Sequence, residues 1–193
     1  MTMSHCGGTI ARTDRRGIPM ARSMAWGAKV SKTFRDRVLW IESDLGIAAD
    51  HLMAAMAFES GETFRADVKN AAGSGATGLI QFMPATARAL GTTVEKLAAM
   101  TPEDQLNYVY KYFKPYAGRL RTLSDLYMAI LWPRAVGKPE SYVLWTRESA
   151  PTTYRQNSGL DADRNGAITK AESAGKVQAK LVKGCQPGNV WRG

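Results

Sequence analysis

Apolar residues recur at helical spacing along much of this chain. Four of them fall at positions i, i+4, i+7 and i+11 and predict one face of a helix over about 32–45, which Gly46 would end. A second helix is expected over 49–58, where most residues are apolar or strong helix formers. The residues that mark the first helix are Phe34, Val38, Ile41 and Leu45.

Capping and stop residues delimit the helices that follow. A Ser or Thr side chain caps a helix start, Pro suits the first turn, and Gly or Pro ends a helix. Alternating polar and apolar runs are almost absent, so the fold class is mainly α. The expected helices are 84–90 ended by Gly91, 94–99 capped by Thr93, 102 to about 112 capped by Thr101, and 125–131 capped by Ser124 and stopped by Pro133.

Glu59 is an acid at the end of the apolar second helix, and Gly61 follows it as a natural helix stop. The helix dipole disfavours negative charge at a C-terminus, and apolar neighbours would remove water from the carboxyl group. Both effects raise a carboxyl pKa and favour a general acid. On the local pattern alone, a solvated glutamate in the last turn, beside a solvated Glu62, is the more common situation.

The loop after this helix contains a glycine-rich stretch, G-S-G-A-T-G over 73–78, which matches the G-x-G-x-x-G pattern of dinucleotide-binding proteins. That pattern requires a strand before it and a helix directly after it, and 65–70 shows no clear strand pattern. We interpret the glycines as residues that permit tight turns and the close approach of a ligand.

The residues around this loop resemble the first two motifs of the lytic transglycosylases of the soluble-transglycosylase (SLT) type. Glu59-Ser60 is followed by G-L-I-Q-F-M-P-A-T-A over 78–87, where the family has Glu-Ser and then Gly-Leu-Met-Gln-x-Met-Pro-x-Thr-Ala. This family is part of the lysozyme-like superfamily and is related in fold to goose-type lysozymes. The resemblance covers about 46–145.

The resemblance implies a lysozyme-like helical domain with a small cleft-lining loop or β region, and peptidoglycan as the substrate. Glu59 would protonate the oxygen of the β-1,4 bond from N-acetylmuramic acid (MurNAc) to N-acetylglucosamine (GlcNAc). It would then take the proton of the muramyl C6 hydroxyl, leaving a 1,6-anhydro end. Ser60 would orient Glu59, and Gln81 and Phe82 would line the cleft.

The third family motif, Ala-Tyr-Asn-Ala-Gly, is altered in this chain. Its place falls within 126–137, L-Y-M-A-I-L-W-P-R-A-V-G, which has no Asn. Tyr127 is the aromatic counterpart in this comparison, and Trp132 and Tyr142 are further candidates for stacking on sugar faces. Packing in the core is the alternative role for each of these three aromatic residues.

Two other functions stay open at the level of sequence. A hydrolytic muramidase, or lysozyme, needs a second carboxylate to act as nucleophile or to activate water, and Glu62, Asp67 and Asp104 are candidates. A non-catalytic virion protein could instead use a lysozyme-like domain only to bind glycan. The presence of Glu59 favours an enzyme, since a binding protein needs no desolvated acid.

The chain carries a formal net charge of +9, which suggests an anionic partner such as an acidic wall polymer. No run of basic residues interleaved with aromatics and no nucleic-acid motif is present, so we expect no nucleic-acid partner. No apolar run is long enough for a transmembrane helix, so we expect no membrane span.

Residues 1–30 contain scattered arginines and glycines and no apolar stretch typical of a secretory signal. We expect an extended basic arm. Together with the resemblance, the missing signal favours a phage-encoded enzyme. It would be a tail or internal virion component, or an endolysin held in the host cytoplasm before release, and it would act in the periplasm or cell wall. The arm would contact other virion proteins.

Residues 161–172 complete the pattern D-x-[DN]-x-[DN]-G-x5-E of an EF-hand calcium loop, with a solvated turn as the alternative. An exiting helix is expected over about 170–182, while 154–159 is too short and polar for a full entering helix. The stretch resembles a single, half-formed EF-hand with a structural calcium ion that catalysis does not need. The expected ligands are Asp161, Asp163, Asn165, Ala167, Thr169 and Glu172.

The chain is therefore divided into an arm, a lysozyme-like catalytic domain over 31–149 and a C-terminal part over 150–193. The C-terminal part would begin with a linker at 150–153 and end in a basic tail. Cys6 and Cys185 are expected to be free thiols, because two cysteines do not form a disulfide framework.

Overall fold

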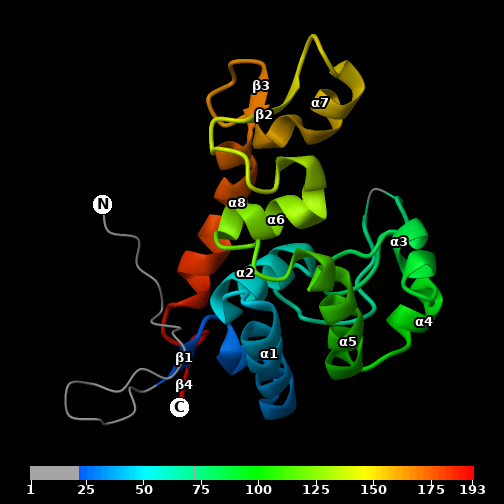
Figure 1. Ribbon diagram of the computed structural model, residues 1–193, viewed down its shortest axis with the longest axis vertical. Coiled ribbons are helices and arrows are strands. Elements are labelled where there is room, and N and C mark those ends of the chain that lie inside the picture. Colours follow the sequence, from blue (N-terminus) through cyan, green and yellow to red (C-terminus); the bar gives the residue numbers. More distant parts are fainter. Residues whose placement is uncertain (1–21, 72) are drawn as a thin grey trace.

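The computed structural model describes residues 22–71 and 73–193 and is mainly helical (Figure 1). Two two-stranded sheets and four short 3₁₀ turns complete the described part of the chain. None of the helices in these two ranges has the length and apolar character that a membrane span requires. The 3₁₀ turns are Gly27–Lys29, Lys114–Tyr116, Pro133–Ala135 and Ser158–Leu160.

The two N-terminal helices form as the apolar pattern predicts. Helix α1, Lys32–Leu45, buries the four predicted apolar residues and ends at Gly46, which has a φ of 68°. Helix α2, Ala49–Glu59, is buried on all sides from residue 49 to residue 57. Such a helix must be covered by other elements around its whole circumference, and Figure 1 shows α2 at the centre of the molecule.

The helices between residues 84 and 131 largely confirm the capping analysis. Thr93 and Thr101 accept hydrogen bonds from the first-turn amides of α4 and α5. At α6 the predicted cap is wrong: Thr122 accepts from the Asp125 amide at 3.0 Å, while the Ser124 hydroxyl donates to Glu140. The four helices are α3, Pro84–Ala89; α4, Val94–Ala98; α5, Pro102–Phe113; and α6, Leu123–Leu131.

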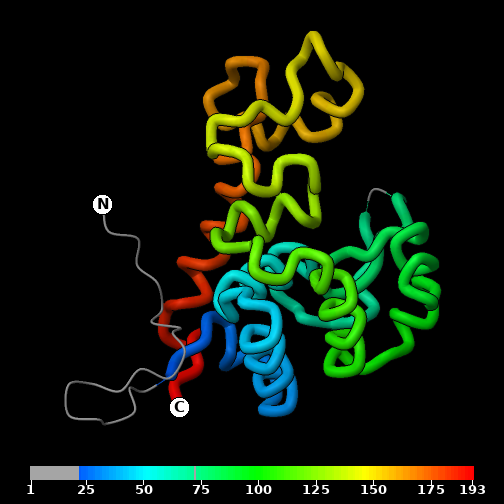
Figure 2. The backbone as a smooth tube through the Cα atoms, viewed as in Figure 1, coloured from blue at the N-terminus to red at the C-terminus, as the bar shows by residue number. Residues whose placement is uncertain are grey.

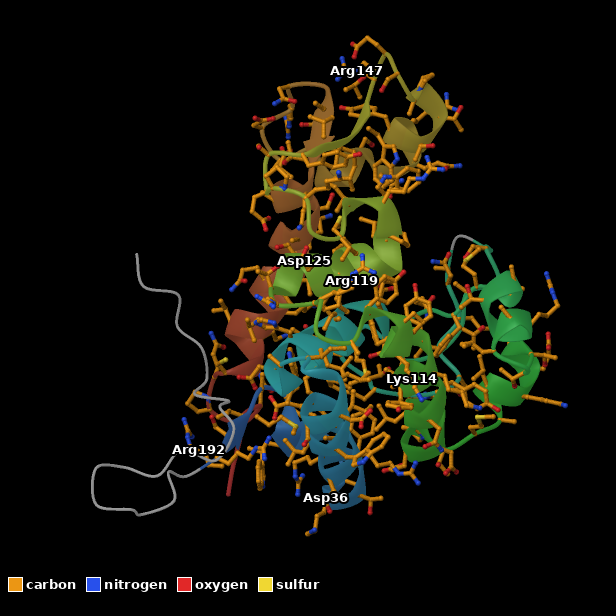
Figure 3. All side chains as sticks on the ribbon, viewed as in Figure 1. Asp36, Lys114, Arg119, Asp125, Arg147 and Arg192 are labelled. Atoms are coloured by element: carbon orange, nitrogen blue, oxygen red, sulfur yellow. The ribbon has the colours of Figure 1, made fainter. Side chains whose placement is uncertain are left out.

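The core lies between α1, α2, α5 and α6. Side chains fill the space between α1, α2 and α5, and charged residues such as Asp36 and Lys114 lie at the surface (Figure 3). Fully buried side chains such as Met53, Met56 and Phe113 show that α2 and α5 both contribute to this core. The predicted mainly α helical domain is confirmed.

Residues 22–30 do not form the expected extended arm. Strand β1, Ser23–Met24, pairs antiparallel with β4, Trp191–Arg192, so both ends of the described chain lie together (Figure 2). Met24 and Trp26 are buried in the core. Their apolar side chains stabilise this segment against the body of the protein. The rest of the predicted arm, 1–21, lies outside the described residues.

The predicted linker at 150–153 is helical in the structure. Helix α7, Pro151–Asn157, starts at a proline, which suits the first turn of a helix. Strand β2, Val143–Thr146, pairs antiparallel with β3, Ala167–Thr169, within the stretch predicted to bind calcium. The loop 161–172 therefore follows α7, includes β3, and runs into the first turn of helix α8, Lys170–Gly184.

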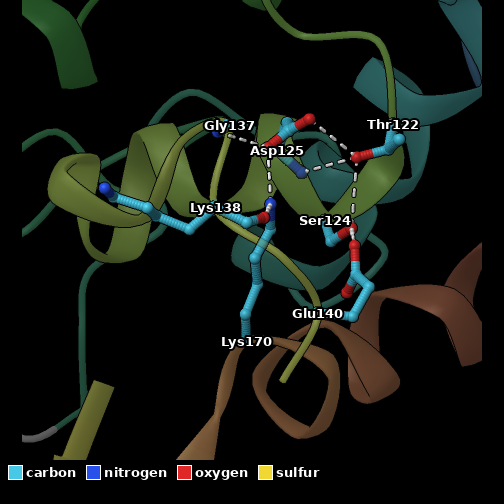
Figure 4. A network of polar contacts seen from close by, with 7 residues as sticks. All are labelled: Thr122, Ser124, Asp125, Gly137, Lys138, Glu140 and Lys170. Atoms are coloured by element: carbon cyan, nitrogen blue, oxygen red, sulfur yellow. Dashed lines mark hydrogen bonds and ion pairs between the residues drawn. The ribbon is translucent and has the colours of Figure 1, made fainter. Parts of the chain in front are cut away.

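Helix α8 packs along both α2 and α6 (Figure 1). At its start, the buried Lys170 Nζ donates to Asp125 Oδ1 on α6 at 2.6 Å and to the Lys138 carbonyl at 2.8 Å (Figure 4). The start of α8 is therefore bound to α6 of the predicted catalytic domain. Cys185, directly after α8, is disulfide-bonded, so the expectation of a free thiol there is wrong. Cys6 lies outside the described residues.

Candidate active site

Glu59 is the last residue of α2, and its carboxyl group is largely removed from water. The side chain is only partly exposed, and burial raises the pKa of Glu59 to about 7 from an ordinary value of 4.5. Burial disfavours the charged form because a low-dielectric surrounding solvates a carboxylate poorly. The carboxyl group is therefore protonated in much of the population at neutral pH, as a general acid requires.

The turn after Glu59 is held by the Ser60 hydroxyl. Ser60 is 1% exposed, and its Oγ donates to the Met56 carbonyl at 2.6 Å and accepts from the Phe64 amide at 3.0 Å. Both hydrogen bonds are to the backbone, so Ser60 holds the end of α2 in place and does not present its hydroxyl to a ligand. These contacts fit the role of orienting Glu59 that the resemblance implies for Ser60.

Two tyrosines from different helices lie in the electrostatic neighbourhood of Glu59. Burial raises the pKa of Tyr112, on α5, to about 12, and burial likewise raises that of Tyr127, on α6. The Glu59 charge adds to the increase in both cases. The Tyr112 hydroxyl donates to the Ala129 carbonyl at 2.6 Å, and the Tyr127 ring meets Phe58 edge-on with centroids 5.6 Å apart. Both tyrosines are therefore neutral hydrogen-bonding groups over the working pH range.

Sequence reasoning found Tyr127 but missed Tyr112. A signal was present, because Tyr108 and Tyr112 lie four residues apart on one face of α5, and Tyr116 follows four residues later in the 3₁₀ turn after α5. Sequence alone does not show that this face turns toward the end of α2. Only the packing of α5 in the fold brings Tyr112 close to Glu59.

Gln105 is a second residue that sequence reasoning missed. Its fully buried amide accepts from the Leu79 amide at 2.7 Å and donates to the carbonyls of Ala66 and Leu97. A Cβ atom at Gly78, where φ is +85°, would lie 2.3 Å from Gln105 Oε1. Glycine is therefore required at position 78, because any side chain there would displace the amide that ties the loop to α5.

Gln81 and Phe82 lie at the end of this loop, next to Tyr112. Isolated bridges from Thr77 to Lys69 and from Thr77 to Phe82 form a small β region of the kind expected to line the cleft. Gln81 Nε2 donates to the Val68 and Gly78 carbonyls, and Phe82 is 1% exposed and meets Tyr112 edge-on at 6.1 Å. A small cavity of about 50 Å³ is lined by Ile80, Gln81, Phe82, Met83, Thr86, Tyr112 and Ile130.

Trp132 and Tyr142, the other predicted sugar-binding aromatics, have their contacts elsewhere. Trp132 meets Trp145 of β2 edge-on at 5.3 Å, and Tyr142 has the Lys138 ammonium 5.9 Å from its ring. Both side chains are partly exposed. Among the described residues, their ring partners are Trp145, Arg134 and Lys138, so the structure brings them to the side of the molecule that carries β2.

The three acids considered as a second carboxylate have other partners. Glu62 forms ion pairs with Lys180 at 2.5 Å and with Lys183 at 2.6 Å, and the hydrogen bonds from these lysines lower its pKa. Among the described residues, no carboxylate contributes to the raised pKa of Glu59. The other two acids are bound nearby in the chain, Asp67 to Arg65 and Asp104 to the Thr101 hydroxyl.

In the loop 161–172, three carboxylates converge. Asp161, Asp163 and Glu172 each place an oxygen within 4.8 Å of the others. Gly166 has a φ of 88°, which a sharp turn requires. The side chains of Asn165 and Thr169 bond within the loop: Asn165 Oδ1 accepts from the Ala167 amide, and Thr169 Oγ1 donates to Glu172 and caps α8. The clustered acids offer the hard oxygen ligands that calcium prefers.

Residues 40–131 match the family model described as Transglycosylase SLT domain. The match covers slightly less than half of the chain and includes Glu59, Tyr112 and Tyr127. No curated protein matches the chain. The match supports the SLT-type lytic transglycosylase family for this segment, and with it a peptidoglycan-degrading enzyme with a mainly α, lysozyme-like domain.

Proposed function

We propose that the protein is a lytic transglycosylase that cleaves the β-1,4 bond between MurNAc and GlcNAc, with Glu59 as its acid and base. The observation that carries the proposal is a single desolvated carboxyl group with a pKa of about 7, beside two neutral tyrosines and without a second carboxylate among the residues that influence it. A retaining or inverting hydrolase of the usual kind needs two carboxylates.

In the proposed reaction, the Glu59 carboxyl donates its proton to the glycosidic oxygen as the bond to the MurNAc C1 breaks. The GlcNAc portion leaves as an alcohol, and positive charge develops at C1. The MurNAc C6 hydroxyl then attacks C1 and gives its proton to the Glu59 carboxylate. The product has a 1,6-anhydro end, no water is consumed, and Glu59 is again protonated.

A pKa near 7 suits a group that must both donate and accept a proton near neutral pH. Burial makes the carboxylate formed in the first step unstable, and this favours return of the proton from the C6 hydroxyl. The neutral hydroxyls of Tyr112 and Tyr127 supply polar groups beside the reacting centre without an opposing charge.

Residues along the cleft would form the subsites for the glycan. Gln81, which is partly exposed on the loop beside Tyr112, would contact the sugars next to the cleaved bond. Phe82 and Tyr127 are 1% and 4% exposed and would support the wall of the cleft from behind. Trp132 and Tyr142 would contact the glycan farther along, since their partly exposed rings lie toward β2.

The test is mass spectrometry of the ends released from purified peptidoglycan by the wild type and by Glu59→Gln. The wild type should release 1,6-anhydro-MurNAc ends and Glu59→Gln should release none. Reducing MurNAc ends from the wild type would overturn the transglycosylase reaction in favour of a muramidase. Binding of glycan without any cleavage would overturn enzymatic function.

We also propose that the loop 161–172 binds one calcium ion, held by Asp161, Asp163 and Glu172 with the Ala167 carbonyl. The ion would neutralise the clustered carboxylates at the start of α8 and would supply no step of the reaction. Calcium titration by calorimetry of chelator-treated protein should show one site, and Glu172→Gln should weaken it at least about tenfold. No heat of binding in the wild type would overturn this site.

The biological setting stays a prediction from the sequence. We propose a phage enzyme, present in the virion or acting in lysis, on the basis of the family resemblance. Detection of the protein in purified particles by peptide mass spectrometry would test the virion role, and absence from particles would oppose it.

A further inference from the structure

The turn that follows Glu59 is tied to α8 by a double ion pair. The two carboxylate oxygens of Glu62 accept one hydrogen bond each, from Lys180 Nζ and from Lys183 Nζ. The side chains of Glu62 and Lys180 are 23% and 29% exposed, so this contact is partly shielded from solvent. It joins residues that are 118 positions apart in the chain.

The backbone at this turn is held in an uncommon conformation. Gly61 and Glu62 have φ values of 61° and 69°, and the Glu62 amide donates to the Ala57 carbonyl at 2.7 Å. Left-handed backbone is unfavourable for a residue other than glycine, because its Cβ atom crowds the following carbonyl oxygen. Glutamate at position 62 is therefore explained by its side chain and not by the turn, and the double ion pair offsets the conformational cost.

The lysine-bearing end of α8 is itself fixed to the core. Trp26 Nε1 donates to the Lys180 carbonyl at 2.9 Å, and the Lys183 ammonium lies 5.6 Å from the centre of the Trp26 ring. The Trp26 ring in turn packs against Phe64, at 6.1 Å, which lies in the same turn as Glu62. The turn is therefore held from two sides: Phe64 packs in the core, and Glu62 is bound to the lysines of α8.

We propose that Glu62, through Lys180 and Lys183, is a positioning residue that holds the carboxyl group of Glu59 in the cleft. Glu59 is the last residue of α2, and the hydrogen bond from the Glu62 amide to Ala57 closes the same helical end. Without the ion pairs, the left-handed turn would relax, the end of α2 would fray, and water would reach Glu59. This inference rests on the proposed role of Glu59 as acid and base.

The groups around α2 allow this role to be measured. Tyr112 and Tyr127 face Glu59 from α5 and α6, and both stay neutral around pH 7 because their pKa values are raised. Two other carboxylates make contacts at the opposite end of α2. Glu42 on α1 accepts a hydrogen bond from the Ala49 amide, and Asp50 on α2 accepts one from the Ala25 amide, which follows β1. His51 lies on the first turn of α2, so the profiles are also measured in a His51→Gln background. A change near neutrality that persists there reports Glu59.

The experiment compares Glu62→Gln with the double variant Lys180→Met/Lys183→Met in the full chain. The pH dependence of kcat on purified peptidoglycan is measured for each, together with thermal unfolding. Both variants should lose about 10- to 100-fold activity at pH 7. In both, the alkaline limb of the profile should move to lower pH, because hydration of Glu59 lowers its pKa. The conservative double variant Lys180→Arg/Lys183→Arg should keep the activity that the methionine double variant loses. Lys176→Met, which removes an exposed lysine of α8, should behave as wild type.

The pair of variants separates positioning from simple charge effects. Loss of the negative charge at Glu62 would lower the Glu59 pKa, whereas loss of the two positive charges would raise it, so an electrostatic effect moves the limb in opposite directions. Opposite shifts, or an unchanged profile with only a lower melting temperature, overturn the positioning role while the proposed function stands. A wild type that releases no glycan ends overturns the proposed function and this inference together.

Discussion

The end of α2 and the loop 161–172 both contain acidic residues, but the fold treats them in opposite ways. Burial alone raises the pKa of Glu59 to about 7. In the loop, the Tyr154 hydroxyl, with backbone amides such as that of Gly166, lowers the pKa of Asp161. Among the described residues, no hydrogen bond lowers the pKa of Glu59, whereas several lower that of Asp161.

The difference shows how the surroundings of a carboxyl group select its chemistry. A desolvated carboxyl group that accepts no hydrogen bond stays protonated at higher pH than a solvated one. It can therefore donate its proton to the substrate, as an acid catalyst must. Groups that accept several hydrogen bonds and lie close together are ionised and attract a hard cation. The same residue type therefore supports proton transfer at one site and cation binding at the other.

The largest effect should follow neutralisation of Glu59. Glu59→Gln should lower the rate of glycan release by about 10³-fold or more, since the general acid and base is lost. Asp67→Asn, which removes an exposed ion pair with Arg65, should leave that rate unchanged. Release of soluble fragments from purified peptidoglycan measures both. A large loss in Asp67→Asn would restore Asp67 as a second carboxylate and favour a hydrolase.

Lys170 lies within the loop 161–172 as the first residue of α8, and it ties the loop to α6 by its ion pair with Asp125. Its side chain is only 2% exposed, so Lys170→Met would leave a buried carboxylate without its cation. We expect a loss of about 3–5 kcal/mol in the free energy of unfolding, measured by urea denaturation. Asp125→Asn in the Lys170→Met background should recover part of that loss, and no recovery would contradict this account.

The raised pKa of Glu59 predicts that the site costs stability at neutral pH. The folded value of about 7 exceeds the ordinary value of 4.5, so the folded state binds more protons between these two pH values. The free energy of unfolding of the wild type should therefore fall as pH rises from 4.5 to 7. Glu59→Gln should be more stable than the wild type by up to about 3 kcal/mol above pH 7 and equal to it below pH 4.5. A difference that does not vary with pH would contradict a desolvated Glu59.

Whereas the charged form of Glu59 should lower the free energy of unfolding, calcium bound to the loop 161–172 should raise it. At free calcium ten times the dissociation constant, the free energy of unfolding should rise by about 1.4 kcal/mol. The corresponding rise in melting temperature is roughly 3–6 °C, measured by scanning calorimetry with calcium and with chelator. Magnesium at the same concentration is the control, and an equal rise with both ions would indicate nonspecific screening.

Local sequence rules predicted most of the helices, because caps and apolar spacing act within a few residues. Thr101, Pro102 and the two acids after Pro102 marked the start of α5, and the structure places it there. The rules failed where a distant partner decides the outcome. Ser124 donates to Glu140 and so does not cap α6, and residues 22–26 pack in the core because β4 and α8 supply a surface for them.

The sequence by itself determined the helical class of the protein, the place of Glu59 at the end of an apolar helix and the acidic pattern of 161–172. These features depend on neighbours in the chain. Only the tertiary structure decided that Tyr112 joins Tyr127 beside Glu59, that Gln105 holds the loop at Gly78, and that Glu62 is bound to α8. Desolvation and ion pairing depend on which distant segments the fold brings together, and the local sequence pattern does not show which segments these are.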